Sequence, residues 1–416
     1  MPPLSVMFKT VSNRCNLACS YCYYCDSAGA VASERGTNRQ LIETFMPQYM
    51  AYVADCRSAS LAWQGGEPTL ANLAFFEQIV AAEARYAAPG TSLGNAIQTN
   101  GTLLDDAWGR FLHDYNFLVG ISIDGPEAVH DSERRDRGGH GSFRNVMAGV
   151  EVLRRLAVPF NVLCVLGPHN IRSAPDLMRF FRREGIEYLQ FIPAMAFQAS
   201  EPRTPARYLI SAGEYGGFLV ELFDEWLRDG VPRVSIRIFD NFLQSFLGMP
   251  NNLCAHGDTC SAGLVIEQNG DCYPCDFYMD SPWKLGNVLE QPLTEIVRNP
   301  AWPAFERQKS PLPASCAACE YHAWCKGGCP RNRMLGDDGT TGPDYFCAAY
   351  KQFFAYAETR LRALRDRVRN YMAFSEQLLL PGSLSVGRND RCPCGSNRKH
   401  KVCCGNPQLA SSYIFR

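Results

Sequence analysis

The chain has 416 residues, of which 46% are hydrophobic and 20% are charged, and its formal net charge is -1. This length exceeds what one hydrophobic core usually serves, so two or three domains are expected. The near-neutral charge gives no global attraction to nucleic acid or membranes, no apolar stretch is long enough to span a bilayer, and the N-terminus lacks the features of a signal peptide. We therefore expect a soluble, cytoplasmic protein; among its 19 cysteines, the clustered ones are better explained as metal ligands than as disulfides.

Short apolar strands alternate with amphipathic helices from residue 4 to about residue 227. The expected strands are residues 6–11, 59–63, 96–99, 118–123, 160–166 and 188–192. One helix between them carries Val146, Val150, Leu153 and Ala157 at helical spacing. Six strand–helix units in a row predict an α/β fold with a parallel sheet and helices outside it. In barrels built this way, the reactive site lies at the C-terminal ends of the strands.

Three cysteines follow the first expected strand in the spacing C-x3-C-x2-C, namely Cys15, Cys19 and Cys22. Three thiolates hold three irons of a four-iron cluster and leave the fourth iron open, whereas a purely electron-carrying cluster has four cysteines. A zinc knuckle is the alternative, although Cys25 lies too close to Cys22 to close a typical zinc site. The triplet, with Tyr21 beside Cys22, resembles the signature of the radical S-adenosylmethionine (radical SAM) enzymes. That resemblance implies a partial (β/α)6 TIM-like barrel in which SAM binds the open iron and yields a 5′-deoxyadenosyl radical.

Polar motifs at the ends of the next strands resemble the SAM pocket of that family. Paired glycines let a backbone approach a ligand closely, and the Gly-Gly-Glu at 65–67 resembles the family motif that holds the SAM amino group. An arginine among these motifs is a candidate for a bidentate contact with the SAM carboxylate. The ordinary explanation of each motif is a turn, a strand cap or a solvated charge cluster. The expected SAM-binding residues are Tyr21, Gln64, Gly65, Gly66, Glu67, Asn100, Ser122, Asp124 and, for the carboxylate, Arg134.

Eight cysteines between residues 254 and 347 are expected to ligate two complete four-iron clusters. Their order resembles the SPASM domain of radical SAM enzymes that modify peptides, and full protein ligation favours electron transfer over substrate binding at iron. Two structural zinc sites are the alternative. The resemblance implies that Cys254, Cys260, Cys275 and Cys329 hold the first auxiliary cluster, and that Cys316, Cys319, Cys325 and Cys347 hold the second. The region is poor in apolar core, so its fold is expected to depend on metal.

Asp276 directly follows one of these ligands, where a carboxylate can take a proton while the adjacent metal takes an electron. The sequence Tyr-Pro-Cys-Asp-Phe at 273–277 resembles the anaerobic sulfatase-maturating enzymes, as do residues 63–70, 98–103 and 325–329. In that family the adenosyl radical removes a hydrogen atom from the β carbon of a sulfatase cysteine or serine. The aspartate then receives the proton and an auxiliary cluster receives the electron, and the product becomes formylglycine. The negative charge of a cluster is expected to raise the proton affinity of Asp276, whose ordinary explanation would be a turn residue.

Four more cysteines, Cys392, Cys394, Cys403 and Cys404, stand near the C-terminus as C-x-C-x8-C-C. Four soft ligands in a short segment suit one tetrahedral Zn2+, which would supply most of that segment's folding energy. His400 is an alternative ligand in place of one of the last two cysteines. The run resembles the SEC-C motif, a small zinc module associated with protein contacts. The segment is also basic, and the ordinary explanation of that charge is simple solubility.

The predicted organisation is a radical SAM core (1–234), a SPASM domain (235–371), a linker (372–385) and a SEC-C-like zinc motif (386–406). The expected cofactors are three 4Fe–4S clusters, SAM and Zn2+ in the tail. The expected partners are an unfolded sulfatase polypeptide with a C/S-x-P-x-R motif and a low-potential electron donor of the flavodoxin or ferredoxin type, with no nucleic acid and no membrane. The remaining cysteines, Cys25, Cys56, Cys164 and Cys272, are expected to be small buried hydrophobic residues.

Two other functions fit parts of this pattern. One is another SPASM enzyme that crosslinks ribosomal peptides, but such enzymes often carry a leader-binding domain, and the residues ahead of Cys15 are too few for one. The other is a non-catalytic iron–sulfur electron carrier, which would leave the open-iron triplet and the Gly-Gly-Glu loop unused.

Overall fold

The structure is a computed structural model, and it describes residues 4–24, 39–195, 209–260, 263–279, 281–335, 341–378, 386–392 and 397–402. Its contacts divide the chain into two compact units. The first unit consists of Met1–Asn170, Ile192–Leu209 and Thr259–Pro311, and the second of Ile171–Phe191, Ile210–Asp258 and Leu312–Arg416. In this division Thr259–Pro311, a part of the predicted SPASM domain, packs with the N-terminal half of the chain.

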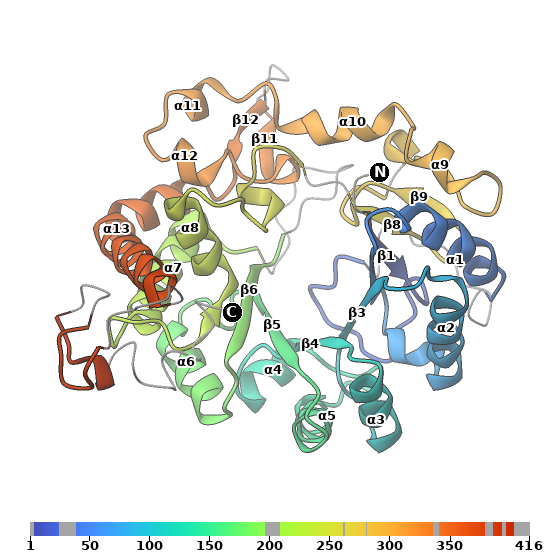
Figure 1. Ribbon diagram of the computed structural model, residues 1–416, viewed down its shortest axis with the longest axis horizontal. Helices are drawn as coiled ribbons and strands as arrows, with labels where there is room; N and C mark the ends of the chain where they lie inside the picture. The colour runs from blue at the N-terminus through green and yellow to red at the C-terminus, as the bar shows by residue number, and fades with distance from the viewer. Residues whose placement is uncertain are drawn as a thin grey trace. The chain divides into compact units, whose positions relative to one another are not determined.

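Five parallel strands, each followed by at least one helix, form the core of the first unit (Figure 1). The strands are β1 (Ser5–Lys9), β2 (Ser58–Gln64), β3 (Ser92–Thr99), β4 (Leu118–Ser122) and β5 (Phe160–Leu166). The helices are α1 (Arg39–Val53), α2 (Leu73–Tyr86), α3 (Asp106–Asp114), α4 (Glu127–Glu133) and α5 (Phe143–Arg155). The expected strands are confirmed to within a few residues, because alternating apolar runs between helices are a strong signal.

Helical periodicity explains which faces these helices bury. In α1, Leu41, Phe45 and Tyr49 recur every four residues and are almost fully buried. In α5 the predicted positions Val146, Val150 and Leu153 are buried, whereas Ala157 lies beyond the helix end with a φ of 54°.

Three further short strands extend this sheet beyond β1. Strand β8 (Leu264–Ile266) runs parallel to β1, β9 (Asp271–Tyr273) returns antiparallel beside β8, and β10 (Gly286–Asn287) follows antiparallel beside β9. The register pairs Val6 with Leu264. Short elements complete the unit, namely η1 (Pro68–Ala71), η3 (Ser281–Trp283), α9 (Leu293–Ile296), α10 (Ala301–Glu306) and η4 (Arg307–Lys309).

The second unit is mainly helical. It contains α6 (Ala174–Arg183), most of β6 (Tyr188–Pro193), α7 (Ala212–Trp226), β7 (Ser235–Ile236), which pairs with β6, and α8 (Arg237–Leu247). Short elements follow, namely η2 (Cys254–His256), α11 (Ala314–Ala317), α12 (His322–Cys325), η5 (Pro330–Asn332), the hairpin of β11 (Arg333–Leu335) and β12 (Thr341–Asp344), and η6 (His400–Val402).

The long helix α13 (Cys347–Leu378) packs against α7 and α8 in this unit. It therefore includes residues 372–378, which the sequence assigned to a linker, because Pro381 is the first helix breaker after them. Among the described residues, no helix combines the length and the apolar character needed to cross a membrane.

Candidate functional site

The three cysteines of the N-terminal triplet lie together in the loop after β1. Cys15, Cys19 and Cys22 are partly buried, and their thiols are close enough to influence one another electrostatically. Burial raises the pKa of Cys15 to about 11, while the Leu17 amide donates a hydrogen bond to its sulfur at 3.4 Å. Three grouped thiols with an amide donor on one sulfur fit the donor set of a four-iron cluster with one open iron.

The Gly-Gly-Glu loop lies directly against this cysteine loop. Gly66 has a φ of 53°, and a Cβ added to it would lie 1.9 Å from the carbonyl oxygen of Arg14. The Glu67 amide donates a hydrogen bond to the same oxygen at 2.8 Å. Only glycine fits at position 66, because the two backbones approach too closely for any side chain.

The Glu67 carboxylate is buried and is used inside the protein. It accepts hydrogen bonds from the Thr69 hydroxyl at 2.7 Å, the Thr99 hydroxyl at 2.6 Å and the Asn100 amide at 2.7 Å. Burial raises the pKa of Glu67 despite these donors. The Asn100 side chain in turn donates to Asn16, between Cys15 and Cys19, at 2.8 Å. Glu67 and Asn100 thus connect the ends of β2 and β3 to the cysteine loop.

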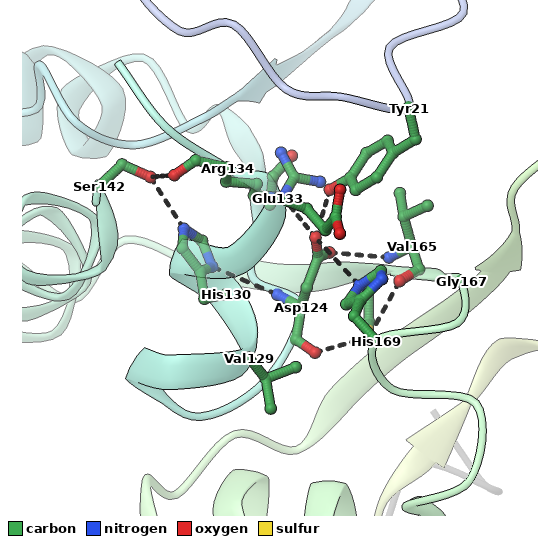
Figure 2. A network of polar contacts seen from close by, with 12 residues as sticks. Tyr21, Asp124, Val129, His130, Glu133, Arg134, Ser142, Val165, Gly167 and His169 are labelled. Atoms are coloured by element: carbon green, nitrogen blue, oxygen red, sulfur yellow. Dashed lines mark hydrogen bonds and ion pairs between the residues drawn. The ribbon is translucent and has the colours of Figure 1, made fainter. Parts of the chain in front are cut away.

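Tyr21, Asp124 and Arg134 form a buried network (Figure 2), and the charges of Asp124 and Arg134 act on the Cys19 thiol. The Tyr21 hydroxyl and the Arg134 Nε, the latter at 2.9 Å, both donate to one oxygen of Asp124, while the Val165 amide donates to the other at 2.9 Å. Burial acts to raise the pKa of Asp124, but the charge of Arg134 and the donors hold it below its usual range. The predicted SAM contacts of Asp124 and Arg134 stay predictions, and the structure gives both residues partners in the protein.

Two histidines that the sequence did not single out complete this network. The Nε2 of His130 lies 3.0 Å from the Ser142 hydroxyl, which donates to the carbonyl of Arg134 at 2.8 Å. Burial lowers the pKa of His130 to about 4, so its ring is neutral. His169 stacks on Tyr21 with ring centroids 6.0 Å apart. Figure 2 shows His169 beside Asp124.

Asp276 lies where three donors from the N-terminal part of the chain converge. Its Oδ2 accepts from the Tyr23 hydroxyl at 2.7 Å and from the Gln64 amide nitrogen at 2.9 Å, and Lys9 Nζ lies 3.4 Å from the same oxygen. The effect of a nearby cluster on the proton affinity of Asp276 stays a prediction. Gln64, predicted as a SAM contact, points its amide to Asp276. The other predicted contact on a strand end, Ser122, accepts a hydrogen bond from Gln98 at 3.2 Å.

The buried Lys9 side chain also lies against the ring of Tyr24. Lys9 is 1% exposed, and its Nζ lies 4.4 Å from the centroid of the Tyr24 ring. The Tyr24 hydroxyl donates to Glu267, at the end of β8, whose pKa is raised by burial. The sequence did not identify Lys9 or Tyr23, and the only signals were a lysine ending an apolar strand and a tyrosine beside Cys22.

In the second unit, the four predicted ligands of the second auxiliary cluster face one pocket. The pocket is lined by Cys316, Cys319, Cys325, Cys347, Tyr350 and Lys351, among others. Four cysteines around one hollow fit a fully ligated cluster.

Two of the four predicted ligands of the first auxiliary cluster, Cys254 and Cys329, are electrostatic neighbours within the second unit. The Cys329 amide donates to Asp344 at 3.0 Å, and burial raises the pKa of Asp344 to about 6. The other two predicted ligands, Cys260 and Cys275, belong to the first unit.

The remaining cysteines differ in burial. Cys164 and Cys272 are fully buried, as expected, whereas Cys56 is partly exposed. Of the predicted zinc ligands in the tail, Cys392 is buried, and Cys394, Cys403 and Cys404 lie outside the described residues, as does Cys25.

Sequence comparisons agree with these motifs. The Radical SAM superfamily profile matches residues 10–181, the SPASM iron–sulfur cluster-binding domain matches residues 257–320, and the SEC-C motif matches residues 388–406. The chain is 35% identical over 372 residues to the cysteine-type anaerobic sulfatase-maturating enzyme of Clostridium perfringens (strain 13 / Type A), covering 89% of this chain and 100% of that protein. It is 32% identical over 403 residues to the serine-type anaerobic sulfatase-maturating enzyme of Bacteroides thetaiotaomicron, covering 92% and 97%.

Solved structures give the same result. The structure of histidine-tagged anSMEcpe with bound AdoMet matches with a TM-score of 0.82 at 34% identity, covering 89% of this chain and 97% of that chain. Native anSMEcpe with bound AdoMet and Cp18Cys peptide matches with a TM-score of 0.81, covering 88% and 100%. Streptococcus suis SuiB matches with a TM-score of 0.56 at 15% identity, which is a likeness of fold alone. The predicted fold class, an α/β radical SAM core followed by a SPASM domain, is confirmed.

Proposed function

The chain belongs to the anaerobic sulfatase-maturating enzymes, which are radical SAM oxidoreductases, and we propose that Asp276 is the general base of its reaction. The enzyme oxidises a cysteine or serine of a sulfatase polypeptide to formylglycine. Cysteine-type and serine-type relatives match at similar identity, so the proposal includes both target residues. Membership of this family favours this function over the two alternatives considered above, a peptide-crosslinking SPASM enzyme and a non-catalytic electron carrier.

The reaction requires one hydrogen atom, one proton and one electron to leave the target side chain. SAM at a cluster held by Cys15, Cys19 and Cys22 would supply the radical chemistry that removes the hydrogen atom from the β carbon, and an iron–sulfur centre held by the other cysteines would accept the electron. Asp276 takes the proton of the thiol or hydroxyl group as the double bond to carbon forms. Serine then gives the aldehyde directly, while the thioaldehyde from cysteine exchanges its sulfur for the oxygen of water and releases hydrogen sulfide.

The observation that carries the assignment is the convergence of Tyr23, Gln64 and Lys9 on Asp276. A general base must be held within about 3 Å of the proton that it takes. Asp276 is 16% exposed in its side chain, so it is accessible, and its donors support the ionised form that can accept a proton.

For the cofactors, we propose the residues that the sequence predicted. Cys15, Cys19 and Cys22 would hold the cluster with the open iron, and the Gly65–Gly66 backbone, of which Gly66 lies against that loop at Arg14, would contact the SAM amino group. Glu67 and Asn100 would shape this pocket through their internal hydrogen bonds. The remaining predicted contacts of this pocket are Tyr21, Gln64, Ser122, Asp124 and Arg134.

Two further 4Fe–4S clusters would occupy the cysteine-rich region. The pocket lined by Cys316, Cys319, Cys325 and Cys347 supports the second assignment. The proximity of Cys254 and Cys329, within a set completed by Cys260 and Cys275, supports the first.

Three proposals depend mainly on the sequence. A Zn2+ ion on the four tail cysteines, Cys392, Cys394, Cys403 and Cys404, agrees with the SEC-C match. The polypeptide substrate would carry C/S-x-P-x-R, and a flavodoxin or ferredoxin would supply low-potential electrons. We also propose a cytoplasmic location, a compartment in which cysteines stay reduced and can serve as metal ligands.

The test is the Asp276→Asn variant, reconstituted with iron and sulfide and assayed with SAM and two peptides that differ only in C-x-P-x-R or S-x-P-x-R. Mass spectrometry should detect aldehyde with the wild-type enzyme on at least one peptide. The variant should still release 5′-deoxyadenosine but should lose aldehyde formation. Full aldehyde formation by Asp276→Asn would remove Asp276 from the base role.

A further inference from the structure

Tyr23 connects two loops, each of which carries a proposed cluster ligand. It directly follows Cys22, while Asp276 directly follows Cys275. The 2.7 Å hydrogen bond from the Tyr23 hydroxyl to Asp276 therefore connects the SAM-cluster loop to the auxiliary-cluster loop. We propose that Tyr23, together with Lys9, is a positioning residue that orients the Asp276 carboxylate for proton transfer. This inference rests on the proposed role of Asp276 as the base.

The Tyr23 ring packs against two other aromatic rings. It packs against Phe277, the residue after Asp276, with ring centroids 5.0 Å apart, and against Tyr24 at 6.2 Å. A phenol held by two ring contacts loses little further freedom when it forms a hydrogen bond, so it can fix the carboxylate more firmly than a long flexible side chain can.

Lys9 approaches the same carboxylate oxygen from the last position of β1. Burying an ammonium group is costly unless a counter-charge is present, and Lys9 has Asp276 as its ion-pair partner at 3.4 Å. The backbone of Gly65 closes over the Lys9 side chain, since a Cβ at Gly65 would lie 2.7 Å from Lys9 Cδ. The cation therefore cannot move away without moving the Gly-Gly-Glu loop.

These contacts define the orientation of the base from three independent segments: strand β1, the end of β2 and the cysteine loop. A base displaced by a fraction of its hydrogen-bond length transfers protons more slowly, because proximity and alignment account for much of its efficiency. Removal of Tyr23 or Lys9 should leave hydrogen-atom removal intact and slow the proton step that follows it.

The test compares Tyr23→Phe and Lys9→Met with Tyr49→Phe as the matched control. Tyr49 also has a buried hydroxyl with hydrogen bonds, to the Leu4 carbonyl at 2.8 Å and from the Ser60 amide at 2.8 Å. These partners lie at the opposite ends of β1 and β2 from Lys9 and Gln64. Each reconstituted variant is given SAM and a substrate peptide deuterated at the reacting β carbon. Two products are measured: deuterium in 5′-deoxyadenosine and peptide aldehyde.

Tyr23→Phe should form deuterated 5′-deoxyadenosine as the wild type does, while the aldehyde formed per deoxyadenosine falls about tenfold, the effect typical of one hydrogen bond to a charged group. Lys9→Met should act in the same direction, and Tyr49→Phe should keep the wild-type ratio. Iron content and melting temperature, measured for every variant, identify any structural loss.

A wild-type ratio in Tyr23→Phe overturns the inference. A parallel fall of both products together with iron content also overturns it, because that pattern is a structural effect. If Lys9→Met does not fold, Tyr23→Phe decides alone. Asp276→Asn is assayed alongside. If this variant forms aldehyde normally, the proposed base itself is wrong. If it is inactive while Tyr23→Phe keeps the wild-type amount of aldehyde per 5′-deoxyadenosine, only the positioning role is refuted.

Discussion

The buried ion pair between Arg134 and Asp124 should stabilise the fold of the protein before SAM binds. Their side chains are 8% and 0% exposed, and the Nε–Oδ2 distance is 2.9 Å. Arg134→Gln would leave the Asp124 carboxylate buried without its counter-charge, although the Tyr21 hydroxyl and the Val165 amide would still donate to it. Breaking a buried pair on one side typically costs about 3–5 kcal/mol of unfolding free energy. We expect a loss toward the lower end, because two donors remain.

The chain offers a control with the same geometry on its surface. Arg144 Nε lies 2.9 Å from Glu127, but these side chains are 87% and 50% exposed. Exposed pairs contribute about 0–1 kcal/mol, so Arg144→Gln should change stability little. Urea denaturation of both variants, followed by tryptophan fluorescence without SAM, compares the same substitution at the same distance in two environments.

Equal stabilities for the two variants would refute this reasoning. The same experiment separates two roles for Arg134. If Arg134 acts only as a ligand of the SAM carboxylate, as the sequence suggested, its replacement should leave the SAM-free protein at wild-type stability and weaken only SAM binding. A loss of stability without SAM means that Arg134 supports the loop of Tyr21 and the cysteines beside it.

Four other changes have defined outcomes. Gly66→Ala should lower the unfolding free energy by roughly 1–3 kcal/mol, since its Cβ would lie 1.9 Å from the Arg14 oxygen; unchanged denaturation would contradict that close approach. Burial lowers the pKa of His130 to about 4, so the neutral ring contributes its full stabilisation above pH 6.5 and loses it as the pH falls toward 4. Between pH 7 and pH 5 the unfolding free energy of the wild type should therefore fall by roughly 2 kcal/mol more than that of His130→Gln. Parallel pH profiles of the two proteins would contradict this. Cys347→Ala should remove about four iron atoms per chain, and unchanged iron content would mean a wrong ligand assignment. Deletion after residue 384 should preserve oxidation of a short peptide, and loss of that activity with full iron content would place the tail in the active site.

The strand–helix pattern was predictable because each of the five parallel strands, five to eight residues long, contains buried apolar residues and stands between segments of helical periodicity. Strands β8, β9 and β10 have only two or three residues, too few for a periodic signal, and they exist because they pair with β1 and with one another. The helical continuation of α13 to Leu378 was missed because a Pro-Gly pair shortly beyond it suggested an earlier end.

The residues of the site were easier to predict than their partners. Spacing predicted the cysteines and the Gly-Gly-Glu loop as site residues, since such motifs act through the local backbone, and these roles stay predictions. It did not predict that Glu67 would be enclosed by hydroxyl and amide donors, or that Arg134 would pair with Asp124, ten residues earlier in the chain. The only sequence signal for Lys9 was its place at the end of an apolar strand, where a lysine is usually a solvated cation, yet Lys9 is 1% exposed and lies against Tyr24 and Gly65.

The pairing of β8 with β1 explains how a residue from the cysteine-rich region reaches the N-terminal site. Register places Val6 beside Leu264 and Phe8 beside Ile266, so the chain after β8 lies next to the end of β1, where Lys9 projects. The β9 strand returns along β8, and the loop that follows it carries Cys275 and Asp276 to Lys9, Tyr23 and Gln64. The predicted domain boundary at residue 235 therefore separates β1 from β8 and β9, although these strands belong to one sheet. Substitutions that weaken this short strand pair should disturb the base and the SAM loop together, even though neither β8 nor β9 contains a proposed catalytic residue.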